Sequence, residues 1–537
     1  MQRAIAADVP NKGLWSSLIS RIRDEWPSLI EWGAAVASGI FLVLAFPNFG
    51  LSILAWVSLA PLLIVLARRP SSLRAFMLGW TTGSIFFYGS CYWLTYSMIH
   101  YGGIPTWLAY LLLVPAVMTV GLFPALFAIL FTLLVQRWRL AILMAPFVWV
   151  SCEWLRLVIT GQLWNALGYS QAYFPSLIQS ASWGGVYAVG LLIVAINSAL
   201  AAAVVLKTKR ALVASGLVII TVALIVTGTF LFNLRQPGPS NSDRTYLDVV
   251  GVQPNVPMTP VKFKNETEEL LQRHLWISLN GLRAFNNPGR PRLVIWPESP
   301  MNFTYTSDTE LQATVISLTQ QQHTSLLLNS LEPAPNNGGF NSALLINEDG
   351  RLISQYDKIR LMPFGEYVPL PWWLGGSLIS GIVGDFTAGD KYTLMPIANH
   401  RAGVFICIES AYPAIARQLS ANGADVLINI SNDGYLGPTA VMRQHLANAI
   451  FRAVENGRPL LRVTNSGITA EITATGTVKG PTQGFIAGGR VWSISDADNR
   501  STFYTKFGDL FVGLCALITI AALLKVFLGK RRSLRTT

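Results

Sequence analysis

Charged residues are scarce in this chain. Only 13% of its 537 residues are Asp, Glu, Lys or Arg, whereas 52% are hydrophobic and the mean hydropathy is +0.43. Soluble globular domains carry about 25% charged residues, so a wholly soluble protein of this size would lack the charges to cover its surface. The same composition excludes a disordered or a collagen-like chain. The hydrophobic residues must therefore be shielded from water, and a lipid bilayer is the environment that this composition favours.

The hydrophobic residues gather in about eight stretches, and all but one of these lie in the N-terminal half of the chain. Most of the stretches approach the roughly 20 residues that a helix needs to cross a bilayer. They cover residues 33–46, 51–67, 75–98, 107–135, 140–160, 187–206, 211–234 and 509–528. The sequence therefore predicts an α-helical membrane bundle of about eight transmembrane helices.

Positive charge exceeds negative charge, and the formal net charge is +12. Lys and Arg occupy alternate connections between the predicted spans, whereas the connections 47–50 and 100–106 contain neither residue type. The basic connections hold Arg68, Arg69 and Arg74, then Arg137 and Arg139, then Lys207, Lys209 and Arg210. Because cytoplasmic loops are enriched in Lys and Arg, both termini are expected in the cytoplasm. The basic excess then marks topology, and no nucleic acid is expected as a partner.

Residues 240–505, between the last two predicted spans, have the composition of an ordinary soluble domain. Short β-branched or Leu-rich runs alternate there with helical segments, which is typical of an α/β layered domain. The topology places this domain outside the cytoplasm. The predicted organisation is a cytoplasmic segment at 1–30, a seven-helix bundle at 31–235, the α/β domain at 240–505, an eighth helix at 509–528 and a basic cytoplasmic tail at 529–537.

Three polar side chains stand at the ends of predicted strands in this domain, where the active sites of α/β proteins are often found. Glu298 follows one buried run, Lys358 follows a pair of strands, and Cys407 lies at the end of another buried run. By itself, Glu298 could equally be a solvated strand end. Lys358 beside Arg360 could belong to a surface pair of basic residues.

Cys407 is distinct among the four cysteines. Cys91, Cys152 and Cys515 lie inside predicted spans, so Cys407 has no disulfide partner in its own domain. A lone thiol is more often a small apolar core residue than a nucleophile. A neighbouring carboxylate or ammonium group would reverse that preference, because such groups activate thiols.

A Glu, a Lys and a Cys in this order, each after a buried strand, resemble the triad of the carbon–nitrogen hydrolase (nitrilase) superfamily. Together with the membrane spans, the chain as a whole resembles the apolipoprotein N-acyltransferase family. The motifs include Ala45-Phe46-Pro47, Glu153-Trp154-Leu155-Arg156, Gly168-Tyr169-Ser170-Gln171, Trp296-Pro297-Glu298, Asp357-Lys358, Pro363-Phe364-Gly365-Glu366-Tyr367 and Ser431-Asn432-Asp433. The resemblance implies a nitrilase-like αββα sandwich inserted between the last two helices.

The resemblance also implies a two-step, ping-pong acyl transfer. Glu298 would be the general base, Cys407 the nucleophile that forms a thioester, and Lys358, with a backbone N–H near Ile408, the stabiliser of the oxyanion. The acyl donor in the family is a phospholipid, usually phosphatidylethanolamine, and the acceptor is the diacylglyceryl-modified N-terminal cysteine of an apolipoprotein. The family implies no cofactor. It places the enzyme in the bacterial inner membrane, with the catalytic domain on the periplasmic side.

Two further carboxylates receive supporting roles from the resemblance. Glu366 and Glu409 would orient Lys358 or the base. Glu366 could instead do no more than satisfy backbone N–H groups in its own turn.

Several other positions are candidates for the substrate pocket. Ile408 stands where the family commonly has Tyr, Tyr435 where it often has Trp, and Phe263 where a Trp is frequent. These three residues are expected to line the lipid pocket. Glu153 and Arg156, three residues apart at a membrane edge, are expected to form a structural ion pair or, alternatively, to contact a lipid headgroup, since charges within a membrane are costly.

Other functions remain open. The five histidines lack the spacing of metal ligands, so no metal site is expected. The domain could be a membrane-bound amidase or nitrilase-type hydrolase with water as the acceptor, or a catalytically silent nitrilase-like scaffold. Its position between two spans favours transfer over hydrolysis, and the intact Glu298, Lys358 and Cys407 argue against a silent scaffold.

Overall fold

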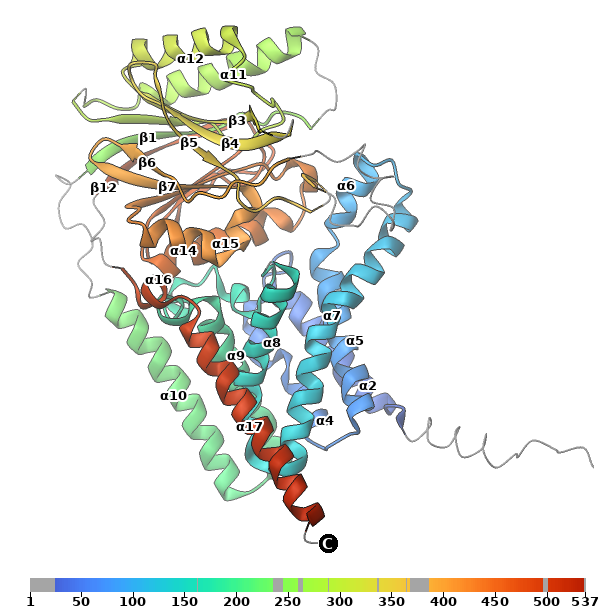
Figure 1. The fold of residues 1–537 in the computed structure, drawn as a ribbon. Helices are drawn as coiled ribbons and strands as arrows, with labels where there is room; N and C mark the ends of the chain where they lie inside the picture. Colours follow the sequence, from blue (N-terminus) through green and yellow to red (C-terminus); the bar gives the residue numbers. More distant parts are fainter. Residues whose placement is uncertain are drawn as a thin grey trace, which may run out of the picture.

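The computed structural model describes residues 25–161, 163–234, 245–258, 264–287, 289–335, 338–363, 365–367, 386–495 and 501–535. This part of the chain forms a helical bundle with an α/β domain stacked on one end of it (Figure 1). α10 (Lys209–Leu234) precedes the first strand of the domain, and α17 (Leu510–Arg535) follows its last strand. The α/β domain is thus inserted between these two helices.

The bundle consists of long helices joined by short helical turns. Its other α-helices are α2 (Leu29–Ala45), α3 (Ala55–Ser58), α4 (Ala60–Leu66), α5 (Ser72–Cys91), α6 (Leu94–His100), α7 (Thr106–Arg137), α8 (Ala145–Thr160) and α9 (Ala181–Leu206). The 3-10 turns are η1 (Ser52–Leu54), η2 (Arg139–Met144), η3 (Leu167–Gln171) and η4 (Pro175–Leu177). Within the described residues, five helical stretches are long and apolar enough to cross a membrane: Thr106–Arg137, Arg139–Thr160, Ala181–Leu206, Lys209–Asn233 and Leu510–Leu528. These helices make the chain a membrane protein.

The predicted count of about eight transmembrane helices is not confirmed, because the first three predicted stretches are not single long apolar helices. α2 has 17 residues, and the helical segment Ser52–Leu66 is also short. α2 ends early because Pro47 forces the preceding Phe46 into an extended conformation, with φ −93° and ψ 158°. The third predicted stretch is divided between α5 and α6.

α5 and α7 pack closely because α5 has two glycines four residues apart on the face toward α7. A Cβ atom at Gly79 would lie 2.5 Å from the carbonyl oxygen of Pro124, and a Cβ at Gly83 would lie 3.0 Å from the Cα of Gly121. Small residues at this spacing let two helix backbones approach in a membrane, where van der Waals packing drives association. These glycines therefore set the separation of the two helices.

The α/β domain contains two six-stranded sheets, one packed on the other, between two layers of helices (Figure 1). The first sheet has the strand order β12-β1-β2-β3-β4-β5 and the second has the order β11-β10-β9-β8-β7-β6. The strands are β1 (Thr245–Gln253), β2 (Arg292–Ile295), β3 (Ser325–Pro333), β4 (Gly339–Ile346), β5 (Leu352–Asp357), β6 (Leu394–Ile397), β7 (His400–Ile406), β8 (Val426–Ser431), β9 (Leu460–Thr464), β10 (Ala470–Ile472), β11 (Val478–Lys479) and β12 (Gly488–Ser495).

Helices cover both outer faces of this pair of sheets. α11 (Lys264–Leu282) and α12 (Thr309–Gln322) cover the first sheet. α14 (Pro413–Ala421) and α15 (Val441–Asn456) lie between the second sheet and the bundle, beside the short α16 (Phe503–Phe507). The predicted order of layers, α–β–β–α, is confirmed.

Aliphatic side chains from both sheets fill the space between them. Val249 of β1 and Leu345 of β4 belong to the same buried cluster as Val404 of β7 and Ile428 of β8. β1, β2 and β3 are parallel to one another, and so are β7, β8 and β9. Parallel strands end at the same edge of their sheet, so the loops that follow them gather there.

The domain is joined to the bundle by buried hydrogen bonds of α15. Gln444 accepts from the indole N–H groups of Trp93 at 3.0 Å and Trp164 at 2.9 Å. Its amide nitrogen donates to the carbonyl oxygens of Pro47 at 2.7 Å and Ser90 at 2.9 Å. One side chain of the domain therefore binds three separate segments of the bundle.

The other end of α15 binds α9 where that helix is interrupted. Gly185 has φ +64°, which breaks α9 and exposes the N–H groups of its second half. The Glu455 carboxylate accepts from the Val186 N–H at 2.9 Å and from the Arg452 guanidinium at 2.8 Å. A carboxylate at a helix start satisfies a free N–H group and interacts favourably with the helix dipole.

We expect the substitution Gly83→Leu to lower the stability of the bundle by about 1–3 kcal/mol, because the added side chain forces α5 away from α7. The midpoint of thermal unfolding in detergent would measure the loss. The control is Gly216→Leu on α10, where an added Cβ meets nothing within 4 Å. Equal midpoints for the two variants would contradict this account of the α5–α7 contact.

Candidate active site

The three predicted triad residues meet at the edge where β2, β5 and β7 end. The Lys358 ammonium lies 3.4 Å from Glu298 Oε1 and 2.8 Å from Glu366 Oε1. The side chain of Lys358 is only 1% exposed, so its charge is separated from water. Burial alone would lower the pKa of Lys358, but the charges of Glu298 and Glu366 outweigh it and raise that pKa well above its usual value. Lys358 is therefore a permanent cation.

The two carboxylates that face Lys358 are held by donors on other segments. The Asn341 amide on β4 donates to Glu298 at 2.9 Å and to Glu366 at 2.7 Å. Glu298 also accepts from the backbone N–H of Asn432 at 3.1 Å, and Glu366 from that of Met362 at 2.7 Å. Both carboxylates are thus fixed before any substrate arrives.

Asn341 is a site residue that the sequence did not reveal. It lies beside Ser342 near the start of a largely apolar strand, and an Asn in such a place usually indicates an edge or a turn. Its side-chain oxygen accepts from Asn329 Nδ2 at 2.7 Å, so a pair of buried amides supports the carboxylates. The only feature of the sequence that could have indicated this pair is that both Asn residues fall on neighbouring buried strands.

Cys407 occupies an unusual backbone conformation. It is the first residue of the 3-10 turn η7 (Cys407–Ala411), directly after β7, and its φ is +52°. Left-handed backbone is uncommon for a residue with a Cβ and costs of order 1 kcal/mol, and it concentrates at functional sites. The turn brings the half-buried thiol out of the strand.

The thiol of Cys407 is protonated at rest. Burial raises its pKa above the usual range, the charge of Glu298 raises it further, and the charge of Lys358 acts in the opposite direction. A protonated thiol needs a base before it can act as a nucleophile. Glu298 is the carboxylate that acts most strongly on it.

Glu409 is fully buried and joins the segment around Lys358 to the segment around Cys407. Its carboxylate accepts from the backbone N–H of Ile359 at 2.7 Å and that of Ile406 at 2.7 Å. It also accepts from the Tyr356 hydroxyl at 2.9 Å and from the Arg360 N–H at 3.0 Å. Burial raises the pKa of Glu409 to about 7, and the N–H donors of Ile406 and Arg360 act against that rise.

Among the described residues, no three His, Cys, Asp or Glu side chains are grouped so that they could hold a metal ion. The polar groups of the site are instead joined to one another by hydrogen bonds and ion pairs. The arrangement provides a thiol, a carboxylate that can take its proton, and a cation that can stabilise negative charge on an oxygen.

Two family models match successive parts of the chain. The apolipoprotein N-acyltransferase N-terminal domain matches residues 38–199, and the carbon-nitrogen hydrolase model matches residues 249–493. An apolipoprotein N-acyltransferase from Geobacter metallireducens is 32% identical over 517 residues, which cover 93% of this chain and 95% of the relative. The chain belongs to the apolipoprotein N-acyltransferase family.

One further family member and one solved structure are also similar to parts of the chain. An apolipoprotein N-acyltransferase from Rhizobium meliloti is 30% identical over 466 residues, with 82% of this chain and 85% of the relative covered. An amidase from Nesterenkonia sp. matches 50% of this chain and 96% of its own length, at 16% identity and a TM-score of 0.37. The family resemblance inferred from sequence motifs is confirmed over most of the chain.

Two of the three predicted pocket residues, Ile408 and Tyr435, lie in the described part of the chain. Ile408 packs against the cluster that contains Trp93 and Trp164 of the bundle. Tyr435 is 53% exposed on the turn η8 (Gly434–Leu436), and its carbonyl accepts from the Ser97 hydroxyl at 2.6 Å. Phe263 lies outside the described residues.

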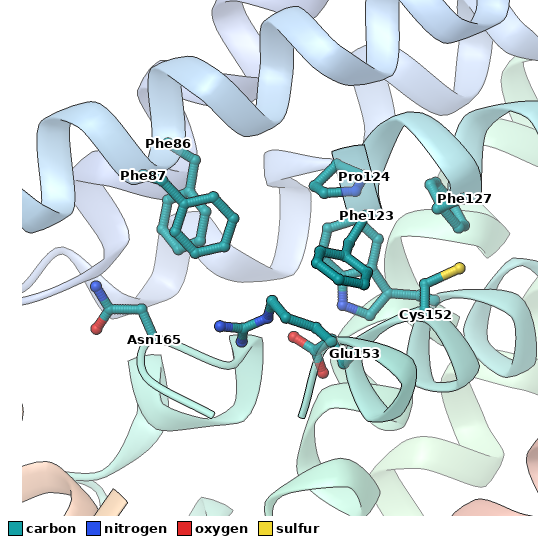
Figure 2. Close-up of a pocket in the computed structure, with 10 residues that line it drawn as sticks. Phe86, Phe87, Phe123, Pro124, Phe127, Cys152, Glu153 and Asn165 are labelled. Carbon is teal, nitrogen blue, oxygen red and sulfur yellow. The ribbon is translucent and has the colours of Figure 1, made fainter. Parts of the chain in front are cut away.

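Glu153 and Arg156 of this family member lie in the bundle, on α8. Glu153 accepts from the Leu167 N–H at 2.8 Å, and Arg156 donates to the Trp164 carbonyl at 2.8 Å. Both side chains thus hold the segment 164–167, and no ion pair within 4.0 Å joins them to each other or to the triad in the described part of the chain. Both side chains line a pocket whose lining is largely aromatic and includes Phe86, Phe87, Phe123 and Phe127, and Figure 2 shows Glu153 among these residues.

We expect Glu409→Gln to destabilise this family member. The Glu409 carboxylate has two oxygens that accept from hydroxyl and N–H donors, whereas the amide of Gln has only one acceptor oxygen. At least one buried donor therefore loses its partner, at a cost of about 1–3 kcal/mol. The thermal unfolding midpoint should fall, and alkylation of Cys407 by iodoacetamide should change rate because the turn is no longer held.

The control for this substitution is Glu471→Gln. Glu471 pairs with Lys479 at 3.0 Å on the surface, where Lys479 is 56% exposed, and such pairs contribute little. If Glu409→Gln matched the wild type in both measurements, Glu409 would not hold the two segments together.

Proposed function

We propose that the chain transfers an acyl group from a membrane phospholipid to the lipidated N-terminal cysteine of an apolipoprotein. The relatives named apolipoprotein N-acyltransferase support this function. The observation that carries it is the ion pair of the buried Lys358 and the half-buried Glu298 at 3.4 Å, whose charges both act on the Cys407 thiol. A base, a cation and a thiol in one site are what the formation and opening of a thioester require.

The first step transfers the acyl group to Cys407. Glu298 accepts the thiol proton while Sγ attacks an ester carbonyl of the phospholipid. Lys358 and the N–H of Ile408 stabilise the oxyanion of the tetrahedral intermediate. The ester C–O bond then breaks, the leaving oxygen takes the proton from Glu298, and a lysophospholipid departs. Phosphatidylethanolamine is the donor that family membership suggests.

The second step transfers the acyl group to the acceptor. The α-amino group of the diacylglyceryl-modified cysteine attacks the thioester carbonyl, and Glu298 accepts a proton from the nitrogen. The C–S bond breaks, the sulfur regains a proton, and an amide is formed. No cofactor is needed, because the thioester itself activates the acyl group.

The remaining site residues have supporting roles in this proposal. Glu366 and Glu409 position Lys358 and the Cys407 turn. Ile408, Tyr435 and Phe263 line the pocket for the lipid chains. Their departures from the family's usual residues would alter which acyl chains or acceptors are preferred, rather than the chemistry.

The proposed location is the bacterial inner membrane, with the α/β domain on the periplasmic side and both termini in the cytoplasm. The Lys209 end of α10 and the C-terminal end of α17 lie at the end of the bundle far from the α/β domain (Figure 1). Lys and Arg are enriched at the cytoplasmic ends of membrane helices. α2, the segment Ser52–Leu66 and α5 would complete eight spans. With this topology we propose the same domain boundaries as from the sequence, namely 31–235, 240–505 and 509–528.

We expect cysteines introduced at the exposed positions Arg139 and Ala313 to react from opposite sides of the membrane. A membrane-impermeant maleimide added to cells with a permeabilised outer membrane should label Ala313→Cys on α12 and should not label Arg139→Cys on η2. The protein without introduced cysteines is the control for labelling of its own four cysteines. Labelling of Arg139→Cys in intact inner membranes would contradict the topology.

We expect the purified protein to acquire a hydroxylamine-sensitive label on Cys407 when it is incubated with acyl-labelled phosphatidylethanolamine. The label should pass to a diacylglyceryl-cysteine peptide and persist when the peptide is omitted. Cys407→Ser should form no thioester, whereas Cys91→Ser, in the bundle, should label as the wild type does. Peptide mapping by mass spectrometry identifies the modified residue.

The same experiment separates the alternatives. Label that is lost equally fast without the peptide would indicate a hydrolase, and the absence of label would indicate a catalytically silent scaffold. Acyl transfer by Cys407→Ser at the wild-type rate would exclude the proposed nucleophile.

A further inference from the structure

His445 of α15 is a buried titratable residue that touches the nucleophile and has no part in the mechanism above. It is 3% exposed. Its Nδ1 lies 2.7 Å from Asp433 Oδ1, and its Nε2 lies 2.9 Å from the carbonyl oxygen of Cys407. A carbonyl and an ionised carboxylate only accept hydrogen bonds. Both ring nitrogens of His445 therefore face acceptors, and Nε2 carries the proton that the Cys407 carbonyl accepts.

The partner carboxylate is held in its ionised form. Burial acts to raise the pKa of Asp433, but the Arg462 guanidinium and His445 outweigh it and lower that pKa to about 2. Arg462 Nη2 lies 3.0 Å from Asp433 Oδ2, and both side chains are almost fully buried. Asp433 therefore receives donors from two sides and has no proton to offer His445.

The carbonyl that His445 holds belongs to the strained residue of the site. The carbonyl oxygen of Cys407 also accepts from Asn429 Nδ2 at 3.5 Å, and Asn429 is itself bound by Arg462 Nη1. Two donors thus restrain the peptide that follows a left-handed residue. Without them, this peptide could rotate to relieve the backbone strain.

The same peptide unit provides a donor on its opposite side. The Cys407 carbonyl and the Ile408 N–H share one planar peptide group and point in opposite directions. Ile408 is the second residue of the turn η7, and the first N–H groups of a helical turn lack an intrahelical acceptor. A hydrogen-bond donor at the carbonyl polarises the peptide and strengthens its N–H as a donor.

We propose that His445 is a positioning residue that acts through the Cys407–Ile408 peptide, holding its carbonyl so that the Ile408 N–H faces the oxyanion of the reacting acyl group. The inference rests on the proposed function in one respect, namely that an ester acylates Cys407. In this proposal, a residue of α15 orients the backbone N–H that forms one half of the oxyanion site. Lys358 provides the side-chain half independently.

Two substitutions separate the two hydrogen bonds of the ring. His445→Asn keeps a donor near the place of Nδ1, so it can serve Asp433 and leaves the Cys407 carbonyl without this partner. His445→Gln reaches the place of Nε2, so it can still donate to that carbonyl. The matched control is His274→Asn, a fully buried histidine of α11 whose Nδ1 contacts the Leu270 carbonyl at 2.7 Å.

The test compares two reactions of Cys407 in the full-length protein. Acylation by a 4-nitrophenyl ester develops an oxyanion, whereas alkylation by iodoacetamide does not. Loss of one oxyanion donor lowers a rate by about 10²- to 10³-fold, so acylation of His445→Asn should fall by about 10²-fold. Its alkylation should stay within about threefold of the wild type, because no oxyanion has to be stabilised. His445→Gln should acylate at least about tenfold faster than His445→Asn, and His274→Asn should acylate as the wild type does.

Each result decides the proposal. Unchanged acylation in His445→Asn would overturn it, and so would parallel losses of acylation, alkylation and thermal stability, since these indicate a purely structural role. Equal losses in the Asn and Gln variants would also overturn it. A wild type that is acylated by the 4-nitrophenyl ester, but transfers nothing from phosphatidylethanolamine to the peptide, would refute the proposed function and leave the role of His445 standing. A wild type that forms no acyl-enzyme would refute both.

Discussion

The ammonium group of Lys358 is buried between two carboxylates, and most of the site is arranged so that this charge stays compensated. Leaving a buried charge unpaired costs several kcal/mol, so Glu298 and Glu366 must both reach it. They remain in place because Asn341 donates to both and because backbone N–H groups hold their second oxygens. The carboxylates and the ammonium group are thus preorganised, an arrangement that can stabilise developing negative charge with little reorganisation.

The backbone of Cys407 depends on a second set of buried groups, which reaches into the membrane part of the chain. Glu409 ties the turn of Cys407 to the segment of Lys358. α15 places His445 against the Cys407 carbonyl, while its neighbour Gln444 binds the bundle. The orientation of the nucleophile is therefore coupled to the way in which the domain is seated on the helices. An isolated α/β domain would expose Gln444 without its partners and would leave Glu455 without the Val186 N–H.

The sequence predicted the features whose signal is local. Strand ends followed by Glu298, Lys358 and Cys407 can be recognised because each polar residue adjoins its own apolar run. Asn341 was not recognised, because a single Asn near a strand end has many ordinary explanations, and the sequence did not show which segments Gln444 would bind. The partners of Gln444 lie 280 to 397 positions away in the chain. Only the packed structure brings them together.

The sequence by itself determined the family, the α–β–β–α order of layers and the membrane character, and it predicted Glu298, Lys358 and Cys407 as the groups of one site, because these follow from hydrophobic runs and from motifs along the chain. The tertiary structure decided the protonation of those groups and their orientation toward one another. Burial and neighbouring charges keep Lys358 charged and the Cys407 thiol protonated. The left-handed backbone of Cys407 is held by distant side chains. Such properties depend on distances between segments, and hydropathy and motif spacing contain no information about those distances.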